Sequence, residues 1–158
     1  VAVFKLPSDG RTDYIKRVIG LPGDKIRVTN GEIYLNENKI LRKKLNDFID
    51  NDKNAFIKRI RKYLEYHDDL TFEVLDIMDD GIADNTKLFL VPKGHFFVMG
   101  DNRDNSQDSR FKTVGFIPIE NLVGKARFIF FSLENSRFLQ IWKWPKSIRG
   151  NRIFKKII

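Results

Sequence analysis

The sequence predicts a mainly β protein, in which an antiparallel β core carries a smaller inserted α+β subdomain. Short segments rich in β-branched and aromatic residues recur along the chain, separated by turns that contain Gly, Pro, Asn or Asp. One of these turns, Asn30-Gly31, is the strongest short-range signal of a two-residue β-hairpin. The composition changes between Ile40 and Asp84, where Lys, Asp and Asn dominate and apolar residues are scattered. This change in composition predicts that the subdomain is inserted here.

Length and composition limit the classes of protein. A chain of 158 residues fits one domain, or a core with a modest insertion, and 42% hydrophobic residues with 14 Phe suffice for a core. The net charge of +8 suits nucleic acid, anionic lipid or simple solubility. The absence of Cys excludes disulfides and thiol catalysis, and His67 and His95 lie too far apart to indicate a zinc site.

The two ends of the chain differ in character. No apolar run approaches the ~18 residues of a membrane span, and no secretory signal begins the sequence. The chain opens at Val1 already in strand alternation, without an initiator Met, so we expect it to be cut from a longer protein. Near the other end, the stretch 137–145 combines cations with Trp142 and Trp144, which suits either a membrane interface or packing on the β core.

The flanking regions predict the strands of the core. Before the insertion we expect strands at 1–6 and 13–19 and a hairpin of 26–28 with 33–35. After it we expect strands at 87–91 and 95–99, an extended segment at 115–118, a helical turn at 120–122 and a last long strand at 125–133. The predicted division is a β core of residues 1–35 and 87–158, with residues 36–86 as an inserted cap.

The insertion allows two interpretations. Phe56, Ile60, Tyr63 and Leu64 have helical spacing, and Asn51 or Asp52 could cap such a helix. The alternative is a hairpin of 62–66 with 71–75 around His67-Asp68-Asp69. We predict a short helix followed by that hairpin.

The polar stretch Gly100-Asp-Asn-Arg-Asp-Asn-Ser-Gln-Asp-Ser-Arg110 lies between apolar segments. Residues of these types bond neighbouring backbone in tight turns. Five of the eleven carry a formal charge, of both signs. The stretch is therefore either a solvated surface turn or a loop of ion pairs that holds a neighbouring site in place.

Lys16 is the best-placed lysine for base catalysis. A free lysine titrates near ~10.4, whereas a base useful at neutral pH should titrate near ~7–8, and burial among apolar groups can lower the pKa that far. Lys16 lies mid-strand beside Tyr14, Ile15, Val18 and Ile19. The alternative is a strand lysine that faces water. Neither histidine lies in a motif of a Ser-His-Asp hydrolase.

Two long motifs resemble type I signal peptidases, the membrane-bound Ser-Lys proteases that release secretory signal peptides. They are Tyr14-Ile-Lys-Arg-Val-Ile-Gly-Leu-Pro-Gly-Asp24 and the stretch 100–110, in the family's order. Further similarity lies in 1–4, 91–99, 115–118 and 121–124, and it thins between about 38 and 84. The resemblance implies the antiparallel β core that signal peptidases share with self-cleaving repressor-type proteases.

The resemblance also implies roles for individual residues. Lys16 matches the general base, and Ser106 matches the serine that orients its amine. Tyr14 and Ile15 match residues that line small-residue pockets and pair the substrate as an added strand. The supporting residues are Arg17 with Asp101, Asp108 with Arg110, and the turn residues Gly100 and Asn102.

One departure from the family pattern concerns the nucleophile. Signal peptidases carry it in a Ser-Met-x-Pro motif that lies before the strand beginning at Val1, and residues 1–158 contain no such motif. Ser8 lies in a turn, and Ser106 and Ser109 match supporting positions. We therefore expect this chain to be the catalytic region without its nucleophile, and inactive by itself.

The implied function is removal of signal peptides from secretory precursors after Ala-x-Ala type sites, without metal or cofactor. The implied location is the outer, periplasmic side of a bacterial inner membrane, with signal peptides and the lipid surface as partners and no nucleic acid. Three alternatives stay open: a repressor-type Ser-Lys protease, a nucleic-acid-binding β domain, and a peptide-binding module without activity.

Overall fold

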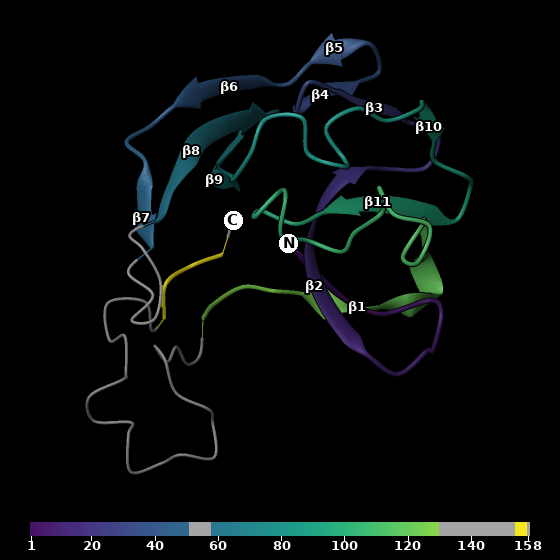
Figure 1. The fold of residues 1–158 in the computed structure, drawn as a ribbon. Helices are drawn as coiled ribbons and strands as arrows, with labels where there is room; N and C mark the ends of the chain where they lie inside the picture. The colour runs from purple at the N-terminus through teal and green to yellow at the C-terminus, as the bar shows by residue number, and fades with distance from the viewer. Residues whose placement is uncertain (51–57, 130–153, 158) are drawn as a thin grey trace.

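The strands predicted from the sequence form an antiparallel β structure, which confirms the expected fold class. The computed structural model describes residues 1–50, 58–129 and 154–157. Within these residues it contains thirteen β-strands in three sheets and one 3-10 helix, η1 (Ile119–Asn121), but no α-helix (Figure 1).

The first sheet carries the segment with Lys16. Its strand order is β12-β11-β2-β1-β13, and every pair is antiparallel. The central strand β2 uses its two halves differently, since residues 13–16 pair with β1 and residues 17–20 pair with β11. The five strands are β1 (Ala2–Lys5), β2 (Asp13–Gly20), β11 (His95–Met99), β12 (Ile117–Pro118) and β13 (Leu122–Lys125).

The second sheet contains the predicted hairpin. Asn30 and Gly31 both have positive φ, 49° and 73°, as a type I′ turn requires, so this prediction is confirmed. The strand order is β10-β3-β4-β5, with β10 (Phe89–Leu90), β3 (Lys25–Thr29), β4 (Glu32–Leu35) and β5 (Asn38–Lys39).

The third sheet corrects the prediction for the insertion. We predicted a short helix that includes Ile60, Tyr63 and Leu64. These residues belong instead to the long strand β8 (Lys58–His67). This strand forms a hairpin with β9 (Leu70–Asp76), as the alternative interpretation proposed, and it also pairs with β6 (Leu41–Lys44) and β7 (Phe48–Asp50). The described part of the insertion is thus β structure and not α+β.

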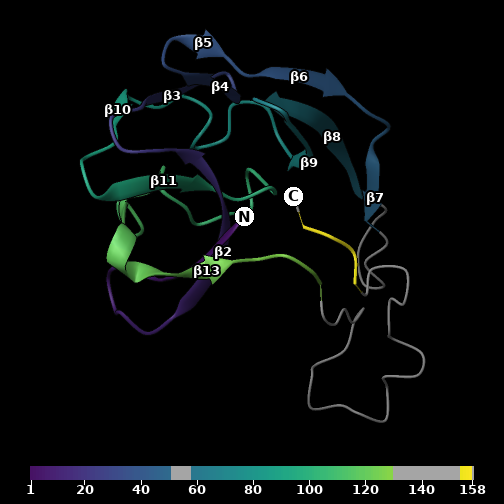
Figure 2. The ribbon, with the colours of Figure 1, turned by 180° about the vertical axis from the view of Figure 1, so that it is seen from behind.

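A shared hydrophobic core joins the insertion to the remainder of the protein. Ile40, Phe72 and Val74 from the insertion pack in one buried cluster with residues of β2, β3 and β11, such as Ile19 and Phe97. A second cluster lies around Phe4 and Phe96 in the first sheet. Figures 1 and 2 show β8 and β9 beside the end of β11 and its following loop from opposite sides. The division at residues 36–86 stays a prediction, but the two parts do not have separate cores.

The C-terminal region differs from its prediction. The last strand of the first sheet is β13 at 122–125, so it ends where the predicted strand 125–133 was to begin. Beyond it, Phe128 forms an isolated bridge with Lys156. The aromatic, basic stretch 137–145 lies outside the described residues. Among the described residues, no helix has the length and apolarity to cross a membrane.

Candidate active site

The fold brings Lys16 and Ser106 into direct contact, although 90 residues separate them. The Nζ of Lys16 donates a hydrogen bond of 2.7 Å to the Oγ of Ser106. Lys16 projects from β2 immediately before the segment that pairs with β11, and Ser106 lies in the loop that follows β11. Ser106 is buried, with 9% of its surface exposed. The amine and the hydroxyl therefore form one unit beside the central strand β2, where its pairing with β11 ends.

Gly100 provides the space for this contact. A Cβ at position 100 would lie 2.5 Å from the Cβ of Ser106 and 3.5 Å from the Nζ of Lys16, and it would overlap the Ser106 Oγ even more closely. Carbon atoms do not approach each other to 2.5 Å without displacement. Glycine is required here for close packing, because any other residue would push Ser106 away from Lys16.

The surroundings of Lys16 shift the pKa of its amine downward. Burial lowers the pKa of Lys16 below its ordinary value, and the positive charge of Arg110 acts in the same direction. The carboxylates of Asp108 and Asp101 oppose this effect, but they are bound by arginines and do not reverse it. The amine also lies 5.5 Å from the centre of the Tyr14 ring. A lowered pKa increases the fraction of Lys16 that can accept a proton.

Asp108 and Arg110 form a buried ion pair within the loop. Asp108 is fully buried, and its two carboxylate oxygens accept hydrogen bonds from the Nε and Nη2 of Arg110 at 2.9 and 2.8 Å. Asp108 also accepts a hydrogen bond from the backbone N–H of Gly100. One carboxylate thus joins the start of the loop to its end and fixes the backbone on which Ser106 lies.

Arg17 and Asp101 form a second bidentate pair. The Nε and Nη2 of Arg17 donate to the Oδ1 and Oδ2 of Asp101 at 2.8 and 2.9 Å. The Arg17 guanidinium also lies over the ring of Phe72, 3.7 Å from its centre, at a position that favours cation–π attraction. Both expected ion pairs are therefore present, and the second is covered by a strand of the insertion.

Arg103 and Glu65 were not identified from the sequence. The Nη1 and Nη2 of Arg103 donate to the two oxygens of Glu65 at 2.6 and 2.5 Å, and both side chains are buried. Nearby, the Oδ2 of Asp104 accepts from the backbone N–H groups of Ile77 and Met78. Glu65 follows Ile60, Tyr63 and Leu64, whose spacing predicted a helix. No sequence pattern therefore indicated these contacts.

Asn102 has a backbone role in the structure. It forms an isolated parallel bridge with Leu75, whose N–H donates to the Asp101 carbonyl and whose carbonyl accepts from the N–H of Arg103. The Oδ1 of Asn102 is buried and accepts no hydrogen bond from the described residues. The loop is thus attached to β9 through its main chain.

Tyr14 and Ile15 lie beside an unpaired stretch of β2. Tyr14 is half-buried against Phe4, and Ile15 is 62% exposed. Residues 13–16 pair with β1 on one side, whereas no strand of the described chain pairs with them on the other side, beyond the end of β11. This free edge runs up to Lys16 and the loop with Ser106.

The two other serines of the described residues do not contact Lys16. Ser8 is exposed in the turn after β1. Ser109 is buried, and its Oγ accepts a hydrogen bond from the N–H of Val98. The described residues contain no group of three or more His, Cys, Asp or Glu that could hold a metal ion.

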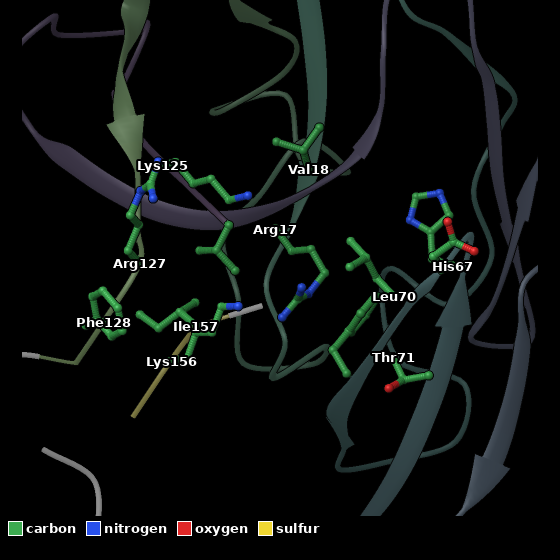
Figure 3. Close-up of a pocket in the computed structure, with 13 residues that line it drawn as sticks. Arg17, Val18, His67, Leu70, Thr71, Lys125, Arg127, Phe128, Lys156 and Ile157 are labelled. Atoms are coloured by element: carbon green, nitrogen blue, oxygen red, sulfur yellow. The ribbon is translucent and has the colours of Figure 1, made fainter. Parts of the chain in front are cut away.

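A cavity of about 610 Å³ borders this site at Arg17. Figure 3 shows Arg17, Lys125 and Lys156 around it, opposite the hairpin residue Leu70. Neither Lys16 nor Ser106 lines the cavity.

Comparison with known proteins identifies the family. The family model described as "Signal peptidase, peptidase S26" matches residues 1–131. Signal peptidase I of Rickettsia typhi is 38% identical over 173 residues, which covers 99% of this chain and 64% of the relative. The protein of the same name from Rickettsia canadensis is 36% identical with the same coverage. A crystal structure of a signal peptidase I from Enterococcus faecalis aligns with a TM-score of 0.45 and 23% identity, over 79% of this chain and 91% of the other.

This chain belongs to the signal peptidase S26 family, as its two motifs predicted. It spans 64% of the length of these rickettsial relatives.

Proposed function

We propose that this chain is the catalytic region of a serine endopeptidase that removes N-terminal signal peptides from secretory precursor proteins. The observation that carries the proposal is the hydrogen bond between Lys16 and Ser106, formed by a lysine whose pKa is lowered by burial. Family membership supports the class of reaction.

In this proposal Lys16 is the general base, and Ser106 aims its amine. The nucleophile is a serine that is not among residues 1–158, where no Ser-Met-x-Pro motif occurs. The serine Oγ attacks the scissile carbonyl carbon, and its proton passes to the Nζ of Lys16. Lys16 then returns that proton to the leaving amine, and an ester links the signal peptide to the serine. Water cleaves the ester, again with Lys16 as the base.

The loop residues act by holding the dyad. Asp108 and Arg110 set the turn, Arg17 and Asp101 attach it to β2, and Asn102 attaches it to β9. Gly100 leaves room for the contact of Ser106 with Lys16.

The free edge of β2 at residues 13–16 is the proposed substrate site. An extended peptide can add there as a further strand, with its backbone bound to the strand and its scissile bond beside Lys16. Alternate side chains would then contact Tyr14 and Ile15. We infer that shallow apolar pockets beside these two side chains accept Ala-sized residues at the first and third positions before the cleavage site, which gives the Ala-x-Ala preference.

The proposed location follows from the substrates. Signal peptides emerge at the outer face of the bacterial inner membrane, so we place the catalytic region on that side, next to the lipid surface. The partners are then the precursor proteins and the membrane, and no nucleic acid takes part. Residues 1–158 by themselves should show no turnover, because Lys16 has no serine to activate.

The test uses an enzyme that carries residues 1–158 together with the serine of a Ser-Met-x-Pro motif. Single-turnover cleavage of a precursor is measured for three variants. Lys16→Ala should abolish cleavage, and Lys16→Arg should do the same, because guanidinium stays protonated and cannot accept the serine proton. Ser106→Ala should reduce the rate by about 10²-fold, since it removes only the group that aims the amine.

The matched control is Ser109→Ala, which removes a buried hydroxyl bonded to the backbone of β11 and not to Lys16. It should affect the rate less than Ser106→Ala does. Retained activity in Lys16→Arg would refute the Ser-Lys mechanism. Turnover by residues 1–158 without the added serine would show that the nucleophile lies within them.

A further inference from the structure

We propose that Glu65 and Arg103 are positioning residues of the active site, through which the β8–β9 hairpin of the insertion holds the loop that carries Ser106. The inference rests on the proposed function, and it assigns to residues 36–86 a part in the reaction.

The ion pair of Glu65 with Arg103 is buried and has a fixed geometry, unlike an ion pair on the surface. Both side chains are buried, with 6% of Arg103 and 2% of Glu65 exposed, and the guanidinium meets the carboxylate through two hydrogen bonds. This bidentate geometry permits one relative orientation of the two groups. Because Glu65 is part of the hairpin ladder, paired with Arg42 on β6 and Phe72 on β9, its backbone cannot follow a moving loop.

A short chain of contacts leads from this pair to the dyad. The carbonyl of Arg103 accepts a hydrogen bond of 2.5 Å from the Nη2 of Arg110. Arg110 binds Asp108, and Asp108 accepts from the N–H of Gly100. Gly100 packs against Ser106, where even an added methyl group would overlap. A shift of Arg103 would therefore be transmitted to the hydroxyl that holds Lys16.

The energetics favour positioning over stability as the role of the pair. The Nε of Arg103 is buried and makes no hydrogen bond to the described residues, so the guanidinium is desolvated without full compensation. Buried ion pairs of this kind are often replaced by apolar residues without loss of stability. The advantage of the charged pair is then its fixed geometry.

The test compares three forms of the serine-containing enzyme. The first replaces both members with residues of similar volume, Glu65→Met with Arg103→Met, so that neither charge is left buried alone. The second is the single variant Glu65→Gln, which keeps the shape and loses the charge. The control is Lys62→Met with Glu73→Met, which removes an exposed ion pair from the same hairpin. Melting temperature, kcat, KM and the pH dependence of single-turnover cleavage are measured for each.

The expected result separates positioning from folding. The Glu65/Arg103 double variant should melt near the wild-type temperature but lose about tenfold in kcat, since small displacements of catalytic groups are costly. KM should stay within about twofold, because neither residue touches the proposed substrate edge. The acidic limb of the pH profile should move to higher pH. A looser loop admits water to Lys16, which Asp101, Asp108, Arg110 and the Tyr14 ring also face.

Each outcome decides the proposal. A folded double variant with unchanged kcat and pH profile would overturn it, as would an equal loss in the Lys62/Glu73 control. If the double variant fails to fold, the Glu65→Gln variant tests the positioning role instead. A lowered melting temperature with unchanged kinetics overturns positioning, and a fall in kcat with a shifted limb supports it. Failure of the proposed function itself would appear separately, as a wild-type enzyme that does not cleave the precursor or a Lys16→Arg variant that does.

Discussion

The side chain of Lys16 combines two requirements that conflict. A charged amine prefers water, whereas a base at neutral pH must lose its proton easily. The half-buried position on β2 lowers the pKa, and the hydrogen bond to Ser106 holds the amine in place. Burial of the amine therefore lowers its pKa at some cost in stability.

This cost predicts how Lys16→Met changes stability with pH. Between the lowered pKa of folded Lys16 and the unfolded value near ~10.4, the unfolded chain binds more protons, so wild-type stability rises with pH across this window. Lys16→Met should be the more stable protein at neutral pH, by less than about 1 kcal/mol because the amine is only partly buried. The difference should shrink as pH rises through the window. Urea unfolding at pH 7 and at pH 10.5 measures it.

The control for this measurement is Lys43→Met, on an exposed position of β6. It should leave the unfolding free energy unchanged within about 0.5 kcal/mol. A Lys16→Met gain that is equal at both pH values would contradict the assignment of a lowered pKa to Lys16.

The loop at 100–110 owes its shape to ion pairs and main-chain contacts. Asp108 and Asp101 each accept hydrogen bonds from an arginine, and the backbone of the loop forms hydrogen bonds with Leu75 of β9. The alternative of a solvated surface turn is therefore excluded for this loop, because Arg103, Ser106, Asp108 and Ser109 are buried.

Asp108→Ala should lower both stability and activity. It leaves the Arg110 guanidinium buried without its partner and removes the acceptor for the Gly100 N–H. Breaking a buried pair costs about 3–5 kcal/mol, whereas an exposed pair contributes only about 0–1 kcal/mol. Asp13→Ala, which removes the exposed pair with Lys5, is the control. Urea unfolding and single-turnover cleavage give the two readouts, and unchanged values for Asp108→Ala would remove the loop from the proposed machinery.

The whole molecule carries a net charge of +8. Its most aromatic and basic stretch, 137–145, lies outside the described residues, so only its composition supports a membrane contact. Cations beside Trp142 and Trp144 suit a surface of anionic lipid.

Vesicle sedimentation tests this contact. The chain should bind vesicles of anionic lipid more than neutral ones, and less at high salt, where screening shortens the electrostatic range. Trp142→Ala with Trp144→Ala should weaken the binding. Tyr66→Ala, an exposed aromatic residue on β8, is the control. Suppose that binding is equal for the two lipids and that neither salt nor the Trp substitutions change it. That result would favour packing of the tail on the protein.

The sequence by itself determined the local structure of the core and the family. Short segments rich in β-branched or aromatic residues predicted β2 and β11, and Asn30-Gly31 predicted a type I′ turn. Both features depend on residues within a few positions of one another. The motifs around Lys16 and Ser106 named the candidates for the site, although their roles stay proposals.

Only the tertiary structure decided what lies between those motifs. Ile60 and Glu65 are buried on opposite faces of β8, so the strand lacks simple alternation, and Ile60, Tyr63 and Leu64 resembled a helix. The pair of Glu65 with Arg103 joins residues 38 positions apart, and Lys16 meets Ser106 across 90. Contacts at such separations depend on how the sheets pack, which no local pattern of residues contains.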